Sequence, residues 1–173
     1  MALIRSVFQD ELDGVSQSLV DLSKMVSTSM KQATEALLTA ELRIAEEVIS
    51  ADEKIDNFQH ELDSRIIDII ARQQPVASDL RALITALRMS ADLERMGDLS
   101  HHIAKVARLR HPETAVPADL HDIVRHMGDA ATKIADKVGS VIETRNTAMA
   151  LELEKDDDVI DTLHRELIGK LTS

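Results

Sequence analysis

Apolar residues recur at steps of three and four along almost the whole chain, and this periodicity restricts the fold more than any other feature. Such spacing places apolar side chains on one face of an α-helix. The pattern therefore predicts an all-α protein built from long amphipathic antiparallel helices. The first row consists of Phe8, Leu12, Val15, Leu19, Leu22, Val26, Met30, Ala33 and Leu37, and the second of Ile44, Val48, Ala51, Ile55, Phe58, Leu62, Ile66 and Ile69.

The helix boundaries follow from length and from the few prolines. An unbroken helix over 8–73 would be about 100 Å long at 1.5 Å per residue, and uncapped patterns of that length usually conceal a turn. We therefore expect a tight reversal near 39–42, although no Gly or Pro marks it. Pro75 disfavours helix at the preceding residue and opens a third helix over about 76–110. Pro112 and Pro117 bracket a linker over 111–116, after which two further helices fill the remaining sequence.

The composition excludes several classes of function. The 173 residues include 20 Lys and Arg against 31 Asp and Glu, a net charge of −11, which argues against nucleic acid and anionic lipid as partners. The absence of cysteine excludes thiolate zinc sites and fits a reducing cytoplasm. No Gly-rich phosphate loop and no H-E-x-x-H motif occurs, so no enzyme is predicted. The most apolar stretch, 66–71, is too short to span a bilayer, so we expect a cytoplasmic protein with at most peripheral membrane contact.

An internal repeat appears when the chain is shifted by 105 residues. Asp52-Glu-Lys-Ile-Asp56 then aligns with Asp157-Asp-Val-Ile-Asp161, and the apolar rows coincide. The offset predicts one three-helix repeat over 1–110, the linker over 111–116, and a second repeat over 117–173 that holds only two helices. We expect the last two helices to expose apolar surface, so that either a second chain covers it, as in a homodimer, or the bundle is poorly soluble alone.

Acidic pairs at helical spacing are candidate metal ligands. Two acids four residues apart project side by side and repel each other unless a cation offsets their charge. Chance alone predicts roughly five such pairs in a chain this acidic, so one pair is not a site. Recurrence of D-x-x-I-D at the repeat offset distinguishes Asp52, Asp56, Asp157 and Asp161 from chance. The alternative is a set of solvated acids, neutralised by Lys54, Arg95 and Lys155.

The third predicted helix and its histidines add to this set. Its row of apolar residues continues at the same spacing into Glu94 and Asp98. Several histidines lie one turn from an acid, which raises the alternative of a ferritin-like carboxylate-bridged dimetal oxidase or storage bundle. Such sites use Glu-x-x-His, which this chain lacks. We therefore expect the histidines to be exposed or to hydrogen-bond to the metal ligands without binding the ion themselves. These pairs are Asp98 with His101 or His102, Asp161 with His164, and Asp56 with His60.

The region over 71–105 resembles a known family. Arg72-Gln-Gln-Pro-Val-Ala-Ser-Asp-Leu-Arg81, Asp92-Leu-Glu-Arg-Met-Gly-Asp98 and His102-Ile-Ala-Lys105 resemble the PhoU family of phosphate-signalling regulators. The resemblance extends over the whole chain at the level of helix pattern. It implies two similar three-helix bundles and a negative regulator of phosphate uptake and of the phosphate-starvation response. Such a protein is an adaptor between the phosphate ABC transporter, through its ATPase, and a phosphate-sensing histidine kinase.

The resemblance also implies a metal site. The family's E/D-x-x-x-D motifs hold metal ions on the bundle surface. They match three pairs in this sequence: Asp52 with Asp56, Glu94 with Asp98, and Asp157 with Asp161. The expected ion is divalent or ferric: Fe, Mn, Mg or Zn. The family's sixth helix, which carries the partner motif for Asp157 and Asp161, has no counterpart here.

Overall fold

The computed structural model describes residues 2–172, with side chains from Val7 onward. The described residues form five α-helices and one turn of 3-10 helix, with no strand, which confirms the predicted all-α class. The long periodic rows account for the first three helices, each of at least 32 residues. The elements are α1 (Ala2–Thr39), α2 (Leu42–Gln73), α3 (Ala77–Arg110), η1 (Ala118–Leu120), α4 (His121–Thr144) and α5 (Thr147–Leu171).

Three helices end on residues with left-handed backbone rather than on glycine: α1 at Ala40, α2 at Gln74 and α4 at Arg145. Ala40 has φ 57° and its N–H donates to the Ala36 carbonyl at 3.0 Å, so the chain reverses between α1 and α2 at the predicted place. Gln74 has φ 46° and donates to Ile70 in the same way, directly before Pro75. A left-handed residue satisfies a terminal carbonyl of the helix, at a cost of about 1 kcal/mol for a residue with a Cβ.

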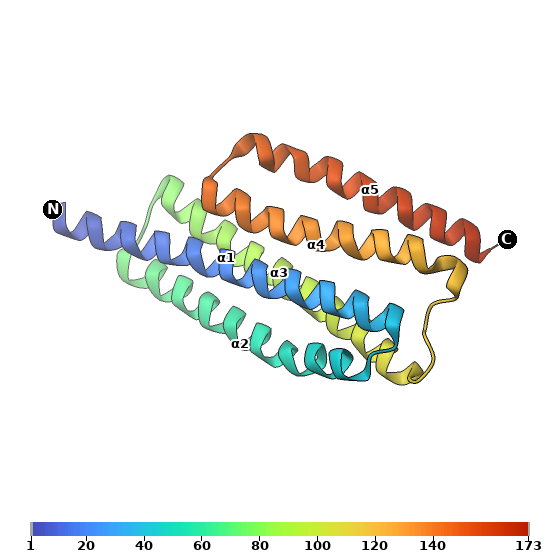
Figure 1. Cartoon of the computed structure of the whole chain (residues 1–173). Coiled ribbons are helices and arrows are strands. Elements are labelled where there is room, and N and C mark those ends of the chain that lie inside the picture. The colour runs from blue at the N-terminus through green and yellow to red at the C-terminus, as the bar shows by residue number, and fades with distance from the viewer. Residues whose placement is uncertain (1, 173) are drawn as a thin grey trace.

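Helix α1 is the centre of the molecule. It packs against α2, α3 and α4 (Figure 1). Helix α5 makes its extensive contacts with α4 alone. The main core lies between α1, α2 and α3, and their buried residues repeat at the predicted helical spacing. Its completely or almost completely buried members include Leu19, Leu22, Val26, Ile55, Leu62, Ile66, Ile69, Leu83 and Leu93.

Small residues bring α4 close to α1. A Cβ atom on Gly128 would lie 2.3 Å from Oγ1 and Cγ2 of Thr34, and one on Gly139 would lie 2.3 Å from Oγ of Ser23. The 105-residue offset relates the two contacts to each other, because Thr34 corresponds to Gly139 and Ser23 corresponds to Gly128. The α1–α4 packing therefore contains two contacts whose positions are equivalent under the offset.

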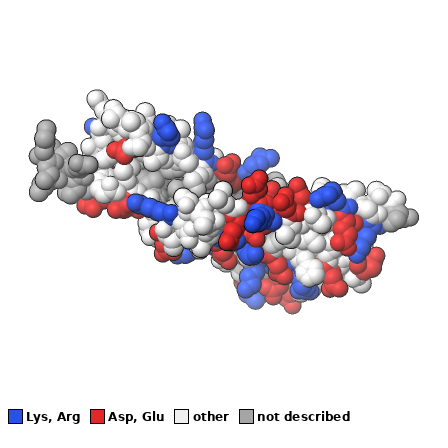
Figure 2. Space-filling view, turned by 90° about the horizontal axis from the view of Figure 1, so that it is seen from above, with Lys and Arg blue, Asp and Glu red and all other residues white. Residues whose placement is uncertain are grey.

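Helix α5 is the least buried part of the chain. None of its residues is buried, and Leu151, Val159 and Leu171 are 72%, 50% and 60% exposed. Seen from above α5, charged side chains gather over the half of the molecule towards the C-terminus, and the other half is mostly uncharged (Figure 2). No helix in residues 2–172 carries an apolar stretch long enough to cross a bilayer.

Candidate metal centre

The packing of α2 against α3 brings acidic residues from both helices together. Asp52 on α2 and Asp98 and His101 on α3 each place one oxygen or ring nitrogen within 4.8 Å of the others. All three side chains are half-buried at the surface between the two helices. We call these three residues the α2–α3 cluster. Asp52 and Asp98 were both predicted from sequence as members of the acidic pairs.

The contact between Asp52 and His101 determines which imidazole nitrogen carries a hydrogen towards Asp52. Asp52 Oδ2 and His101 Nδ1 are in hydrogen-bond contact, with side chains 13% and 15% exposed. A carboxylate accepts only, so Nδ1 carries the hydrogen, and in the neutral form of the ring Nε2 then holds a lone pair. That Nε2 atom and Asp52 Oδ1 are both buried without a hydrogen-bond partner. The cluster thus presents two buried polar atoms that are suited to bind a cation.

The raised pKa values of two carboxyl groups in this region also favour a bound cation. Partial burial raises the pKa of Asp52, the Asp56 and Asp98 charges raise it further, and His101 opposes them. Partial burial also raises the pKa of Glu94, with repulsion from Asp98, Asp56 and Asp52 adding to it. The charges of Asp56 and Asp98 therefore destabilise the charged forms of Asp52 and Glu94. A bound cation would relieve this repulsion.

Basic side chains do not neutralise these acids. Within residues 2–172, no ion pair joins Lys54, Arg95 or Lys155 to an acidic side chain. The arrangement therefore differs from the alternative of solvated acids paired with these three cations. A set of carboxylates with one imidazole suits Mg²⁺, Mn²⁺, iron or Zn²⁺, so the residues present fit the ions that the sequence led us to expect.

The histidines lie differently from one another. His101 contacts Asp52 on the neighbouring helix, whereas the spacing along the chain had paired it with Asp98. His102 is exposed and stacks its ring on that of His101, with 5.8 Å between ring centroids. His60 Nδ1 lies 2.8 Å from the backbone carbonyl of Asp56 in its own helix. A ferritin-like centre takes histidines from two helices, and the described cluster contains one.

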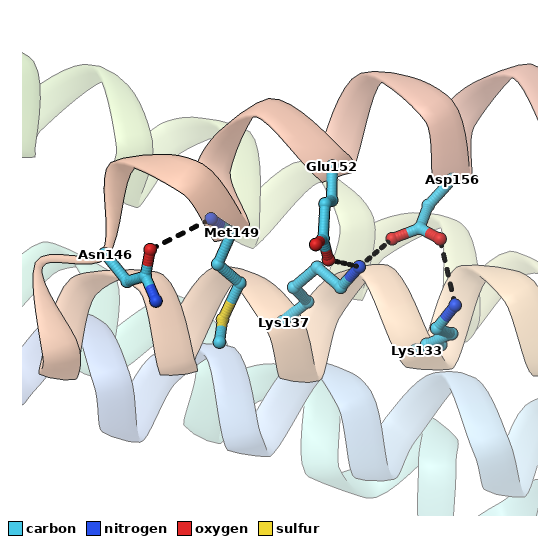
Figure 3. Close-up of polar contacts among 6 residues, drawn as sticks. All are labelled: Lys133, Lys137, Asn146, Met149, Glu152 and Asp156. Atoms are coloured by element: carbon cyan, nitrogen blue, oxygen red, sulfur yellow. Dashed lines mark hydrogen bonds and ion pairs between the residues drawn. The ribbon is translucent and has the colours of Figure 1, made fainter.

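The predicted pair on α5 is not gathered with other ligands. Asp157 and Asp161 are exposed, and no third potential ligand joins them among the described residues. The neighbouring Asp156 instead faces α4, where it accepts from Lys133 at 2.9 Å and from Lys137 at 2.5 Å (Figure 3). Glu152 also accepts from Lys137, at 3.1 Å. Two other acidic residues, Asp156 and Glu152, therefore join α5 to α4, whereas the predicted ligands face solvent.

Comparison with known proteins identifies the family. A profile described as the PhoU domain matches residues 19–107, which contain both predicted pairs of the α2–α3 region. The chain belongs to the PhoU family. It is 36% identical over 168 residues to the phosphate-specific transport system accessory protein PhoU homolog 2 of Mycobacterium tuberculosis, covering 97% of this chain and 79% of that protein.

Solved PhoU structures have the same arrangement of helices. The crystal structure of PhoU from Pseudomonas aeruginosa matches 95% of this chain with a TM-score of 0.86 and 26% sequence identity. The phosphate transport system regulatory protein PhoU from Streptococcus pneumoniae matches 94% with a TM-score of 0.82 and 26% identity. This chain covers 78% and 77% of those two chains. The all-α class and the resemblance to the PhoU family are therefore confirmed, whereas the division into two repeats stays a prediction.

Proposed function

We propose that this PhoU protein is an accessory protein of phosphate transport that limits phosphate uptake and restrains the phosphate-starvation response. It acts in the cytoplasm as a non-catalytic adaptor between the phosphate ABC transporter, through its ATPase, and a phosphate-sensing histidine kinase. Its membership of the PhoU family, with relatives named as phosphate-specific transport system accessory proteins, supports this role. The excess of acidic residues, −11 in all, favours basic faces on both partners.

The α2–α3 cluster supplies a metal-binding part of this proposal. The single observation that carries it is the pair of buried atoms without hydrogen bonds, Asp52 Oδ1 and His101 Nε2. Asp52, Asp98 and His101 would hold the ion, with Asp56 and Glu94 adding negative charge beside it. A bound cation would neutralise the carboxylates and tie α2 to α3. The adaptor's docking surface would then depend on whether the site is loaded.

The mode of docking has a direct test. An electrostatic interaction between an acidic bundle and basic partner surfaces weakens as salt is added. We expect the affinity for the kinase or the transporter ATPase to fall between low and physiological ionic strength. Binding that does not respond to salt would contradict acidic docking, and would indicate that exposed apolar side chains of α3, such as Leu99 and Val106, make the contact instead.

The regulatory role is tested by alkaline phosphatase activity in phosphate-rich medium. A strain of the source organism that lacks the gene is complemented with the wild type, with Glu94→Ala/Asp98→Ala, or with Asp157→Ala/Asp161→Ala. We expect high activity in the deletion strain, repression by the wild type, and failure of the α3 double variant to repress. The α5 double variant removes the same charge from exposed positions and should repress normally.

Each outcome separates one part of the proposal from another. If both double variants repress like the wild type, the regulator stands and the metal site is not needed for regulation. If deletion leaves the activity unchanged, and no second related gene compensates for it, the regulatory role itself is wrong.

A further inference from the structure

Gly97 is a buried glycine inside α3, next to the residues of the α2–α3 cluster. Along α3 it directly precedes Asp98 and comes one turn before His101. Glycine is less favourable than alanine in a helix interior, so a glycine at such a position usually has a packing or functional reason. In this protein the reason lies on the neighbouring helix α2.

The side chain that faces Gly97 is that of Ile55. A Cβ atom on Gly97 would lie 3.1 Å from Ile55 Cγ2 and 3.2 Å from Ile55 Cδ1, closer than ordinary van der Waals contact. Ile55 is 1% exposed and belongs to the main core. On α2 it stands between Asp52 and Asp56 in the sequence. The close approach of Gly97 to Ile55 therefore lies between the acidic residues of the two helices.

The whole buried side of α3 is built from small residues. Six of its eight buried residues are Ala, Ser or Gly, and the other two are leucines. Small side chains let helices approach closely, because the distance between helix axes depends on the residues at the contact. Gly97 differs from the alanines and serines of this side, since even a single added carbon would be crowded there.

The crowding at Gly97 cannot be relieved by turning the Ile55 side chain alone. Rotation about χ2 moves Cδ1 and leaves Cγ2 in place, because Cγ2 is bonded directly to Cβ. A β-branched residue in a helix strongly prefers one χ1 rotamer, so rotation about χ1 is also unfavourable. Val26 of α1 closes the same space, with Cγ2 at 3.8 Å from the added carbon. A methyl group at Gly97 must therefore move α2 away from α3 by a few tenths of an ångström.

A shift of this kind acts on the contacts between the helices and not on those within one helix. Asp52 and Asp56 keep their spacing because both belong to α2. The contact of Asp52 with His101, in contrast, joins α2 to α3. Bonds from protein ligands to a metal ion keep their lengths to within about 0.2 Å. A few tenths of an ångström are therefore enough to withdraw the ligands of one helix from an ion held by the other.

We propose that Gly97 is a positioning residue of the α2–α3 cluster, which sets the separation of α2 and α3 so that ligands from both helices reach one ion. This inference rests on the metal site of the proposed function. Because coupling between binding and packing is reciprocal, a bound ion stabilises the close approach of Gly97 and Ile55 in turn. Loading of the site and the separation of α2 from α3 are thus linked.

Isothermal titration calorimetry with Mn²⁺ tests this role in the full chain. We expect Gly97→Ala to bind Mn²⁺ about tenfold or more weakly, as happens when groups that orient metal ligands are changed, although every ligand is retained. Gly128→Ala is the matched control, because it crowds a glycine of α4 against α1 and not against α2. It should lose stability and bind Mn²⁺ as the wild type does.

Changes at Ile55 separate positioning from a general loss of packing. Ile55→Ala removes both crowding atoms, so adding it to Gly97→Ala should recover most of the Mn²⁺ affinity. The same change creates a cavity in the core and should lower Tm further. A general loss of packing would lower the affinity and Tm together. Ile55→Val removes Cδ1 alone, and with Gly97→Ala it should recover part of the affinity while most of the core is kept.

The metal-free protein provides a readout that does not depend on an ion. In proton NMR spectra, the hydrogen on His101 Nδ1 should give a resolved downfield signal in the wild type and in Gly128→Ala, because Asp52 accepts it. We expect Gly97→Ala to shift or broaden this signal. If the wild type binds no Mn²⁺, the metal part of the proposed function is wrong, and the His101 signal still decides the role of Gly97. A Gly97→Ala protein with the Mn²⁺ affinity and the His101 signal of the wild type would overturn the proposal.

Discussion

Gly128 on α4 lies directly against Thr34 on α1, so close that a Cβ atom at Gly128 would come within 2.3 Å of Thr34 Oγ1 and Cγ2. Gly139 lies against Ser23 in the corresponding way. Atoms of well-packed helices do not approach each other at such distances, so the crossing of α1 and α4 requires a residue without a side chain on α4.

A methyl group at Gly128 should therefore destabilise the fold. Overpacking of this kind costs about 1–3 kcal/mol, which lowers Tm by roughly 5 °C in a protein of this size. Thermal unfolding followed by circular dichroism should show this loss for Gly128→Ala. Adding Thr34→Ala should restore most of it, since the clashing Oγ1 and Cγ2 atoms are then absent.

Gly169→Ala is the matched control for this substitution. It also lies in a helix, but a Cβ there would meet nothing within 4 Å. We expect a small gain in stability, because alanine is favoured over glycine in helices by up to about 1 kcal/mol. Equal losses for Gly128→Ala and Gly169→Ala would mean that the α1–α4 crossing does not depend on the glycine.

Metal binding should depend on Asp52 and not on its counterpart Asp157. Asp52→Asn keeps the shape of the side chain but removes a ligand charge from the α2–α3 cluster. We expect it to weaken Mn²⁺ binding by at least tenfold in isothermal titration calorimetry. Asp157→Asn alters an exposed residue at the same position of the repeat and should bind as the wild type does.

The thermal stability of the same proteins provides a second measurement. An ion that binds only the folded state raises Tm in proportion to its affinity. We therefore expect EDTA to lower the Tm of metal-loaded wild type and of Asp157→Asn, and to leave Asp52→Asn unchanged. A wild-type Tm that responds to neither Mn²⁺ nor EDTA would contradict the site.

The helices were predictable because their signals are local. Spacing of apolar residues gave the five helices, and Pro75 and Pro117 marked two boundaries that the structure reproduces within a few residues. The reversal at Ala40 could be predicted only from helix length, because no glycine marks its left-handed backbone. Asp52 and Asp98 were found for the same reason, because each belongs to a pair within one helical turn.

The contacts that the sequence did not reveal depend on how two packed helices are aligned along their length. His101 meets Asp52 from 49 positions away, and one-turn spacing pairs it with Asp98 instead. On α5, the repeat offset selects Asp157, yet the adjacent Asp156 faces α4. Its partner Lys137 corresponds to uncharged Gln32 in the first repeat, so the offset could not predict an ion pair.

Glu94 should destabilise the metal-free protein at neutral pH. Burial and neighbouring acids raise its pKa above the usual value, so the folded state binds more protons than the unfolded state between the two values. The free energy of unfolding therefore falls as pH rises through that window and stays lower at pH 7. In EDTA, we expect Glu94→Gln to gain about 0.5 kcal/mol at pH 7, measured by urea unfolding.

The gain should disappear near pH 3, where Glu94 is protonated in both states. Glu53→Gln removes an exposed charge on α2 and should change the unfolding free energy less at either pH. With Mn²⁺ present, the order should reverse, because Glu94→Gln then loses charge beside the ion. If Glu94→Gln gained as much at pH 3 as at pH 7, repulsion among the carboxylates would not be the cause.

The ion pair between Lys137 and Asp156 should control how firmly α5 is held. Because α5 has no buried residue, its contact with α4 relies on half-buried apolar side chains and on this polar pair. Lys137→Met keeps the length of the side chain but removes its charge. We expect faster hydrogen exchange of α5 amides in Lys137→Met, with α1 to α3 unchanged. Lys155→Met, at an exposed position of α5, serves as the control.

The same ion pair makes the protection of α5 against hydrogen exchange depend on pH. Hydrogen bonds from Lys137 and Lys133 lower the pKa of Asp156 below its usual value. A lowered pKa means that the stabilisation is complete above the usual pKa and is lost as pH falls through the lowered one. We therefore expect the difference in α5 protection between wild type and Lys137→Met to be largest at neutral pH and to disappear as pH falls through the lowered pKa of Asp156. A constant difference across this range would show that Lys137 holds α5 through its aliphatic chain, because packing does not titrate.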